Sequence, residues 1–239
     1  MSSILQSRSC DNWNMTSIQA IESLAMIEEA IASMQADRVV FMRFRDGALA
    51  SAIVKQTYFL NYVARWYASS ILQGVRRIVD GRRDTHSLKN VLEHMLRDPD
   101  GWVLERALRH SGRDGYSDAD KAAFKEAIYG PLADLSGRRL DANRIAADLT
   151  TLIETTAVAK QIVDETIAHS SRSPESEYPL NTWIGLHQII DRLEMIALPY
   201  VAISKIASAA SLIPEEVNAW YQIFEPWKYL TESDLEPNV

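Results

Sequence analysis

The sequence predicts an all-α fold, an antiparallel helical bundle with two or three long helices and short flanking helices. Through most of the 239 residues, apolar side chains recur at intervals of three and four, the period of an amphipathic helix. The sequence contains no sustained strand-like alternation and no internal repeat. We expect a single helical domain over residues 16–230, with flexible segments at 1–15 and 231–239.

The composition is that of a chain able to bury a core, at 47% hydrophobic and 24% charged residues. Because no run of about 18 apolar residues occurs and residues 1–14 lack the layout of a secretory signal, we expect a cytoplasmic protein without membrane contact. The single cysteine, Cys10, allows no internal disulfide. No two histidines share the helical spacing of a metal site, so we expect no metal and no cofactor.

Charge is unevenly distributed along the chain. The net charge of −7 argues against a protein that coats nucleic acid in general. Residues 65–113 nevertheless carry ten basic against six acidic residues, whereas residues 161–239 carry four against twelve. This asymmetry is typical either of solvated helix faces or of a surface that engages a partner.

The first half of the chain predicts two long helices. The first spans residues 17–34, with Thr16 or Ser17 as its N-cap. The short apolar run 39–42 is compatible with a strand or a buried helix, and we favour a tight connection or a helix start. The second long helix is expected over residues 48–79, a length of about 50 Å, and Gly81 is expected to end it.

Shorter helices are expected in the middle of the chain. Residues 87–97 carry one apolar stripe, and Asp98 followed by Pro99 is typical of a cap and the first residue of a following helix. The polar stretch 111–118 predicts a loop, after which helical periodicity resumes over residues 118–135.

The last part of the chain predicts three further helices, over residues 142–169, from 182 to about 210, and from 214 to about 227. Asp141 is the expected cap of the first of these. Residues 170–179, rich in serine and proline, predict a break. Pro199 is expected to kink the second, because proline removes a backbone donor and clashes with the preceding turn.

His169 is the candidate for chemistry, since it lies where a long helix is expected to end, in the segment 165-ETIAHSSRSP-174. Glu165 precedes it by four residues and shares its helix face, whereas Asp164 differs from it by roughly 140° around the axis. Two interpretations stay open. One is a surface pair of Glu165 and His169 that stabilises the helix end; the other is a role in a catalytic or RNA-contacting cleft.

Several segments together resemble a known family. Residues 65–95, 160–174, 180–200 and 220–227, taken in order, resemble the HEPN superfamily of helical bundles, and within it the branch that includes a U-type phage abortive-infection protein. The resemblance extends over roughly residues 16–227. It implies a homodimer that acts in prokaryotic phage defence or in a toxin–antitoxin system, with RNA, an antitoxin or another protein as partner.

Many HEPN proteins are metal-independent endoribonucleases whose motif consists of an arginine, a polar residue and a histidine at the end of a core helix. The resemblance maps His169 onto that histidine and Asp164 onto the polar residue, but Val163 stands where the arginine is expected. Valine cannot hold a scissile phosphate as a guanidinium does. Positive charge would have to come from other arginines, and the candidates are Arg172, Arg76, Arg77, Arg82 and Arg83.

Two functions therefore remain as hypotheses. The first is an RNA-directed protein that cleaves RNA with His169. The second is a non-catalytic protein-binding or regulatory module with the same fold. The tryptophans at positions 66, 102, 183, 220 and 227 allow stacking on bases, although such residues usually pack in cores, and Asp80 beside Gly81 is more typical of a turn than of an active site.

Overall fold

The structure is a computed structural model that describes residues 15–51, 58–82, 85–110, 115–170 and 180–204. Within these ranges the chain is helical apart from turns and one isolated bridge between Ala133 and Leu140, which confirms the all-α prediction. The four long helices are α1 (Ser17–Ala50), α2 (Tyr58–Val79), α6 (Ala142–Ser170) and α7 (Leu180–Ser204).

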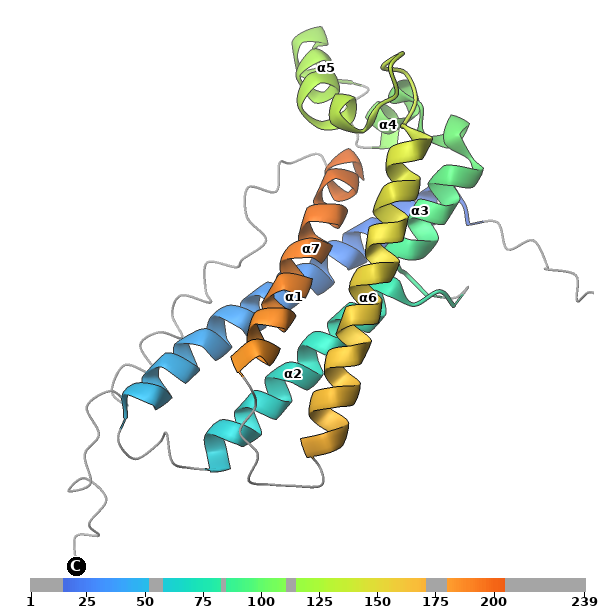
Figure 1. Cartoon of the computed structure of the whole chain (residues 1–239). Helices are drawn as coiled ribbons and strands as arrows, with labels where there is room; N and C mark the ends of the chain where they lie inside the picture. The colour runs from blue at the N-terminus through green and yellow to red at the C-terminus, as the bar shows by residue number, and fades with distance from the viewer. Residues whose placement is uncertain (1–14, 52–57, 83–84, 111–114, 171–179, 205–239) are drawn as a thin grey trace, which may run out of the picture.

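The long helices pack side by side. Helix α1 contacts α2 and α7, and α6 contacts the same two helices. Helices α2 and α7 also contact each other, so each of them has three long neighbours. Consecutive members run in opposite directions, α1 against α2 and α6 against α7 (Figure 1). The buried apolar residues of all four helices form one core, which therefore lies along their shared axis.

Short elements cover one end of this assembly (Figure 1). They are α3 (Leu88–Arg97), the 3-10 helix Pro99–Trp102, α4 (Leu104–His110), α5 (Asp118–Phe124), the π-helical turn Lys125–Tyr129 and the 3-10 helix Gly130–Leu132. Helix α3 packs against α1 and α6. The Tyr129 hydroxyl contacts the carbonyl oxygens of Trp102 at 2.8 Å and Arg138 at 2.9 Å, which ties the short elements together.

Side-chain caps begin the helices where the sequence predicts them. The Thr16 hydroxyl accepts from the backbone N–H of Gln19, and the Gln19 side-chain oxygen accepts from the Thr16 N–H. The Ser87 hydroxyl accepts from the Asn90 N–H at the start of α3. Asp98 and Asp141 likewise accept from backbone N–H groups at the helix starts that follow them.

The prediction of a tight connection or a helix start at residues 39–42 is wrong, because α1 continues through these residues to Ala50. The alternative of a helix is confirmed. Phe41 supplies the physical reason. Its ring is buried and stacks on Tyr67 of α2 at a centroid distance of 4.2 Å, so the apolar run completes the α1–α2 interface as a helix.

The prediction that the second long helix begins at residue 48 is also wrong. Ser51 is the C-cap of α1, and its N–H donates to the carbonyls of Gly47 and Ala48. The next described helix, α2, begins at Tyr58. The helix expected over 118–135 is likewise divided: Pro131 has no N–H to continue an α-helix, and the chain turns into a 3-10 helix that ends at Leu132.

Several expectations lie outside the described residues, namely the flexible ends, the break over 171–179 and the helix from 214 to about 227. Helix α7 continues through Pro199 to Ser204. Among the helices that the structure describes, none has the length and apolar character of a membrane span.

Candidate functional site

Three large aromatic side chains lie exposed on one face of α2. Phe59 is 50% exposed, Tyr62 68% and Trp66 54%. Their spacing of three and four residues places them on one side of a helix. Arg77 follows Trp66 by eleven residues, three helical turns, so it continues the same line. We call Phe59, Tyr62, Trp66 and Arg77 the aromatic-basic face of α2.

The charged residues of helix α2 are all positive. It contains Arg65, Arg76 and Arg77 but no aspartate or glutamate across Tyr58–Val79, in a chain whose net charge is −7. Arg76 and Arg77 lie in its last turn, where the helix dipole favours cations, and both are exposed. The aromatic-basic face therefore ends in positive charge.

The segment after α2 is held in a defined turn. The Asp80 carboxylate accepts from the backbone N–H of Arg82 at 3.0 Å and from its Nε at 2.8 Å. These bonds hold the pKa of Asp80 below its usual value, the backbone bond contributing most. The Asn90 side chain donates to the carbonyls of Arg82 and Thr85. Asp80 is thus a turn residue, and it anchors the Arg82 guanidinium.

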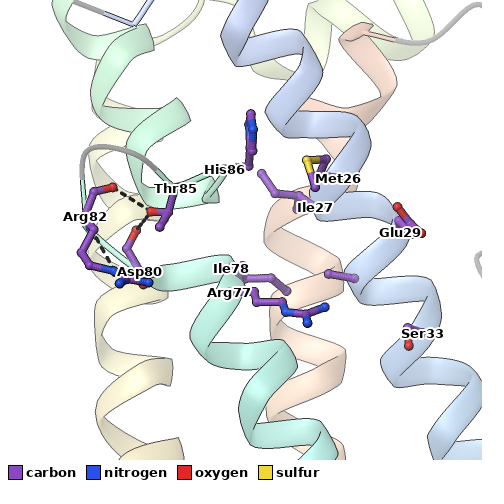
Figure 2. Close-up of a pocket in the computed structure, with 11 residues that line it drawn as sticks. Met26, Ile27, Glu29, Ser33, Arg77, Ile78, Asp80, Arg82, Thr85 and His86 are labelled. Carbon is purple, nitrogen blue, oxygen red and sulfur yellow. Dashed lines mark hydrogen bonds and ion pairs between the residues drawn. The ribbon is translucent and has the colours of Figure 1, made fainter. Parts of the chain in front are cut away.

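A groove of about 550 Å³ lies between α1, the end of α2 and this turn (Figure 2). We call it the α1–α2 groove. Residues 26–33 of α1 form one wall, and Arg77 and Ile78 form the other. One end is closed by Asp80, Arg82, Thr85 and His86. Figure 2 shows the Arg77 side chain extending from α2 toward α1. Among the described residues, Arg77 forms no ion pair or hydrogen bond.

His86 lies at the rim of the groove and is fixed by α1. The Ser23 hydroxyl donates to the carbonyl of Gln19 at 2.7 Å, and Ser23 Oγ lies 3.0 Å from His86 Nδ1. The imidazole of His86 is therefore held against α1 through Ser23.

The predicted catalytic residues lie on α6. The helix is continuous through Asp164, Glu165 and His169, so the four-residue spacing of Glu165 and His169 is helical spacing. Their side chains lie outside the described part of the structure, as do Arg172 and Arg83 altogether. The pairing of Glu165 with His169 stays a prediction.

Within one chain, the helices hold Arg76 and Arg77 away from the end of α6. His169 is next to the last residue of α6, and α6 ends on the side of the molecule where α2 begins (Figure 1). Arg76 and Arg77 lie in the last turn of α2, about 28 Å further along that helix. Arg77 and Arg82 instead lie together at the α1–α2 groove.

Sequence reasoning did not single out Phe59, Tyr62 or His86 as candidate site residues. A signal for the aromatics was present, since residues 59, 62 and 66 share a helix face in a segment without acidic residues. None was present for His86, because its partner Ser23 is 63 positions away in sequence. Of the tryptophans that lie within the described residues with their side chains, Trp66 is exposed, whereas Trp102 is fully buried.

A second polar cluster lies between α1, α2 and α7. Arg38 pairs with Asp191 at 2.5 Å, and Gln35 donates to Glu194 at 2.5 Å. Burial raises the pKa of Tyr67, so its phenol stays protonated. Burial also lowers the pKa of His187, whose ring meets Tyr67 edge-on at 6.1 Å. These groups face one another across helix contacts, so the cluster serves first to hold the helices in register.

Among the residues that the structure describes, no three histidine, cysteine, aspartate or glutamate side chains converge as metal ligands. In comparisons with protein families, with curated proteins and with solved structures, no match to this chain was found.

Proposed function

We propose that this protein is an RNA-directed, HEPN-like protein of a prokaryotic phage-defence or toxin–antitoxin system, and that single-stranded RNA lies along the aromatic-basic face of α2. One observation carries the proposal: three exposed aromatic rings and an arginine follow one line on a helix without acidic residues. Exposed rings stack on unpaired bases of any sequence, and arginines bind the phosphates between them.

The charge and dimensions of α2 support the same reading. From Phe59 to Arg77 the face extends about 27 Å, enough for several nucleotides of an extended strand. Arg76 lies next to Arg77 in the last turn of α2 and adds positive charge at the end of that path, whereas the Arg82 guanidinium is paired with Asp80. Phosphate binding releases counterions, so even a few arginines contribute strongly at moderate salt.

The test compares variants of the exposed rings in binding to a short labelled single-stranded RNA. Tyr62→Ala and Trp66→Ala are each expected to weaken binding about tenfold, because one base loses its stacking partner. The matched control is Met195→Ala, since Met195 is 66% exposed on α7 and lies off this face. Equal affinity of all these proteins for RNA would exclude the aromatic-basic face as the binding surface.

Cleavage is a separate part of the proposal. Wild-type protein and His169→Ala would be incubated with total RNA in the presence of EDTA. Cleavage by the wild type that is lost in the variant supports a metal-independent endoribonuclease with His169 as a proton-transfer group. Retained RNA binding without cleavage by either protein supports an RNA-binding protein that is not a nuclease.

A protein-binding module is the second candidate, and the same face favours it, because exposed aromatic rings also form the centres of protein interfaces. The partner would be a second copy or an antitoxin. Light scattering of wild type and Trp66→Ala separates the cases. A dimer that dissociates in Trp66→Ala, in a protein that does not bind RNA, supports this alternative.

A further inference from the structure

The lining of the α1–α2 groove combines apolar side chains with exposed polar groups. Met26, which is 50% exposed, and the half-buried Ala30 form the apolar surface that a ligand can reach, while Ile27 and Ile78 lie buried in the same lining. Arg77 and Glu29 are exposed on opposite walls of the same space. A ligand with one apolar flat part and several polar groups fits this division.

The size of the groove sets the scale of that ligand. A volume of about 550 Å³ lies within the range of about 300–1,000 Å³ that sites for small molecules and cofactors occupy. This is room for one nucleotide, and too little for folded nucleic acid.

The polar groups match the parts of a ribonucleotide. Arg77 has no ion partner among the described residues, so its guanidinium is available for a phosphate. Glu29 is an exposed carboxylate, and carboxylates accept hydrogen bonds from ribose hydroxyls. Asp80 is already bonded to Arg82, which leaves Glu29 for this role.

The position of the groove connects it with the surface proposed for RNA. Arg77 belongs both to the aromatic-basic face and to the lining of the groove. A strand that follows α2 toward its last turn therefore arrives at the mouth of the groove, where its next nucleotide leaves the helix face.

We propose that the α1–α2 groove binds one ribonucleotide unit, with the base against Met26 and Ala30, the phosphate at Arg77 and the ribose hydroxyls at Glu29. The proposal rests on the proposed function, since the natural ligand is one nucleotide of the RNA that lies along α2. His86, held by Ser23, closes the rim.

The experiment measures binding of adenosine 5′-monophosphate to the full chain by calorimetry. Ser33→Trp fills the groove from α1 and is expected to abolish binding, while Ala25→Trp, an exposed position of α1 outside the groove, keeps it. Arg77→Gln is expected to weaken binding about tenfold. Wild-type protein is expected to prefer the ribonucleotide over its 2′-deoxy form, and Glu29→Gln to lose that preference.

Several results would overturn this assignment. One is unchanged nucleotide binding in Ser33→Trp; another is inorganic phosphate that competes as well as the nucleotide, which would make the groove an anion site only. Failure of the proposed function is distinguishable, because Trp66→Ala weakens the binding of single-stranded RNA and leaves the mononucleotide unaffected. If RNA binds the aromatic-basic face but no mononucleotide binds, the groove assignment fails and the proposed function stands.

Discussion

Met34 of α1 occupies the space that a side chain at Gly74 of α2 would need. A Cβ atom placed on Gly74 would lie 2.6 Å from both Cγ and Sδ of Met34, which is itself 2% exposed. The close approach of the two helices at this point depends on glycine. It brings the aromatic-basic face and the α1–α2 groove onto one rigid pair of helices.

Gly74→Ala is therefore expected to destabilise the protein. Overpacking a core costs about 1–3 kcal/mol, and the gain in helix propensity returns about 1 kcal/mol, so the free energy of unfolding should fall by about 1 kcal/mol. Urea denaturation measures the change. The control repeats Gly74→Ala in a Met34→Ala background, where the clash is gone and the substitution should be neutral or stabilising. The same loss in both backgrounds would contradict the proposed contact.

Tyr129→Phe is expected to loosen the short elements from one another. The Tyr129 hydroxyl contacts the carbonyls of Trp102 and Arg138, and burial raises its pKa, so it remains a donor at all physiological pH values. Removing it leaves buried carbonyl oxygen without its partner, which costs about 1–3 kcal/mol. Thermal unfolding followed by circular dichroism measures this loss. Tyr116→Phe, at a side chain that is 40% exposed, serves as the control and should change little.

How far the sequence predicts the fold depends on how local each signal is. Thr16 and Asp141 cap helices through backbone N–H groups two or three residues away, so their roles could be predicted from neighbouring residues. The continuation of α1 through Phe41 could not, because that ring stacks on Tyr67 in another helix. An apolar run of four residues contains no information about a contact of this kind.

The candidate site shows the same limit. The arginines at the end of α2 could be recognised as a basic cluster, but the wall that faces them comes from residues 26–33 of α1. Likewise, His86 gains its orientation from Ser23 on α1, a partner that periodicity cannot identify. Local patterns predict which side chains are exposed on a helix; they do not predict which second helix completes a groove.

Stability is expected to fall as the pH is lowered from about 7.5 to 5.5. Burial lowers the pKa values of His94 and His187 in the folded chain, with the charges of Arg38 and Arg45 lowering that of His187 further. The pKa of histidine in the unfolded chain is about 6.5. As the pH falls through that value, the unfolded chain binds more protons than the folded chain, so the free energy of unfolding decreases. The decrease ends when the pH falls below the pKa values of the folded chain. Melting temperatures across this range measure the slope.

A variant isolates the contribution of these two histidines. His94→Gln with His187→Gln should lower stability at pH 7.5 yet flatten the dependence on pH, because neither position titrates any longer. An unchanged slope in the double variant would assign the pH dependence to other groups.

RNA binding is expected to depend on salt through the arginines at the end of α2. For a single-stranded RNA, each lost contact with a phosphate reduces the slope of log affinity against log salt concentration by about 0.7. Replacing Arg76, Arg77 and Arg82 together by glutamine should therefore reduce the slope by about 2, provided that each one contacts a phosphate. Anisotropy titrations over a range of salt concentrations measure it.

The matched control replaces three other exposed arginines, Arg106 and Arg109 of α4 and Arg138 after the short helices, and so removes the same total charge from another part of the surface. Long-range attraction alone would give both triple variants the same slope. Direct contact at the end of α2 requires the first variant to lose more than the second. If the control loses as much, the strand does not follow the aromatic-basic face toward Arg77, and the RNA path must be sought on another surface.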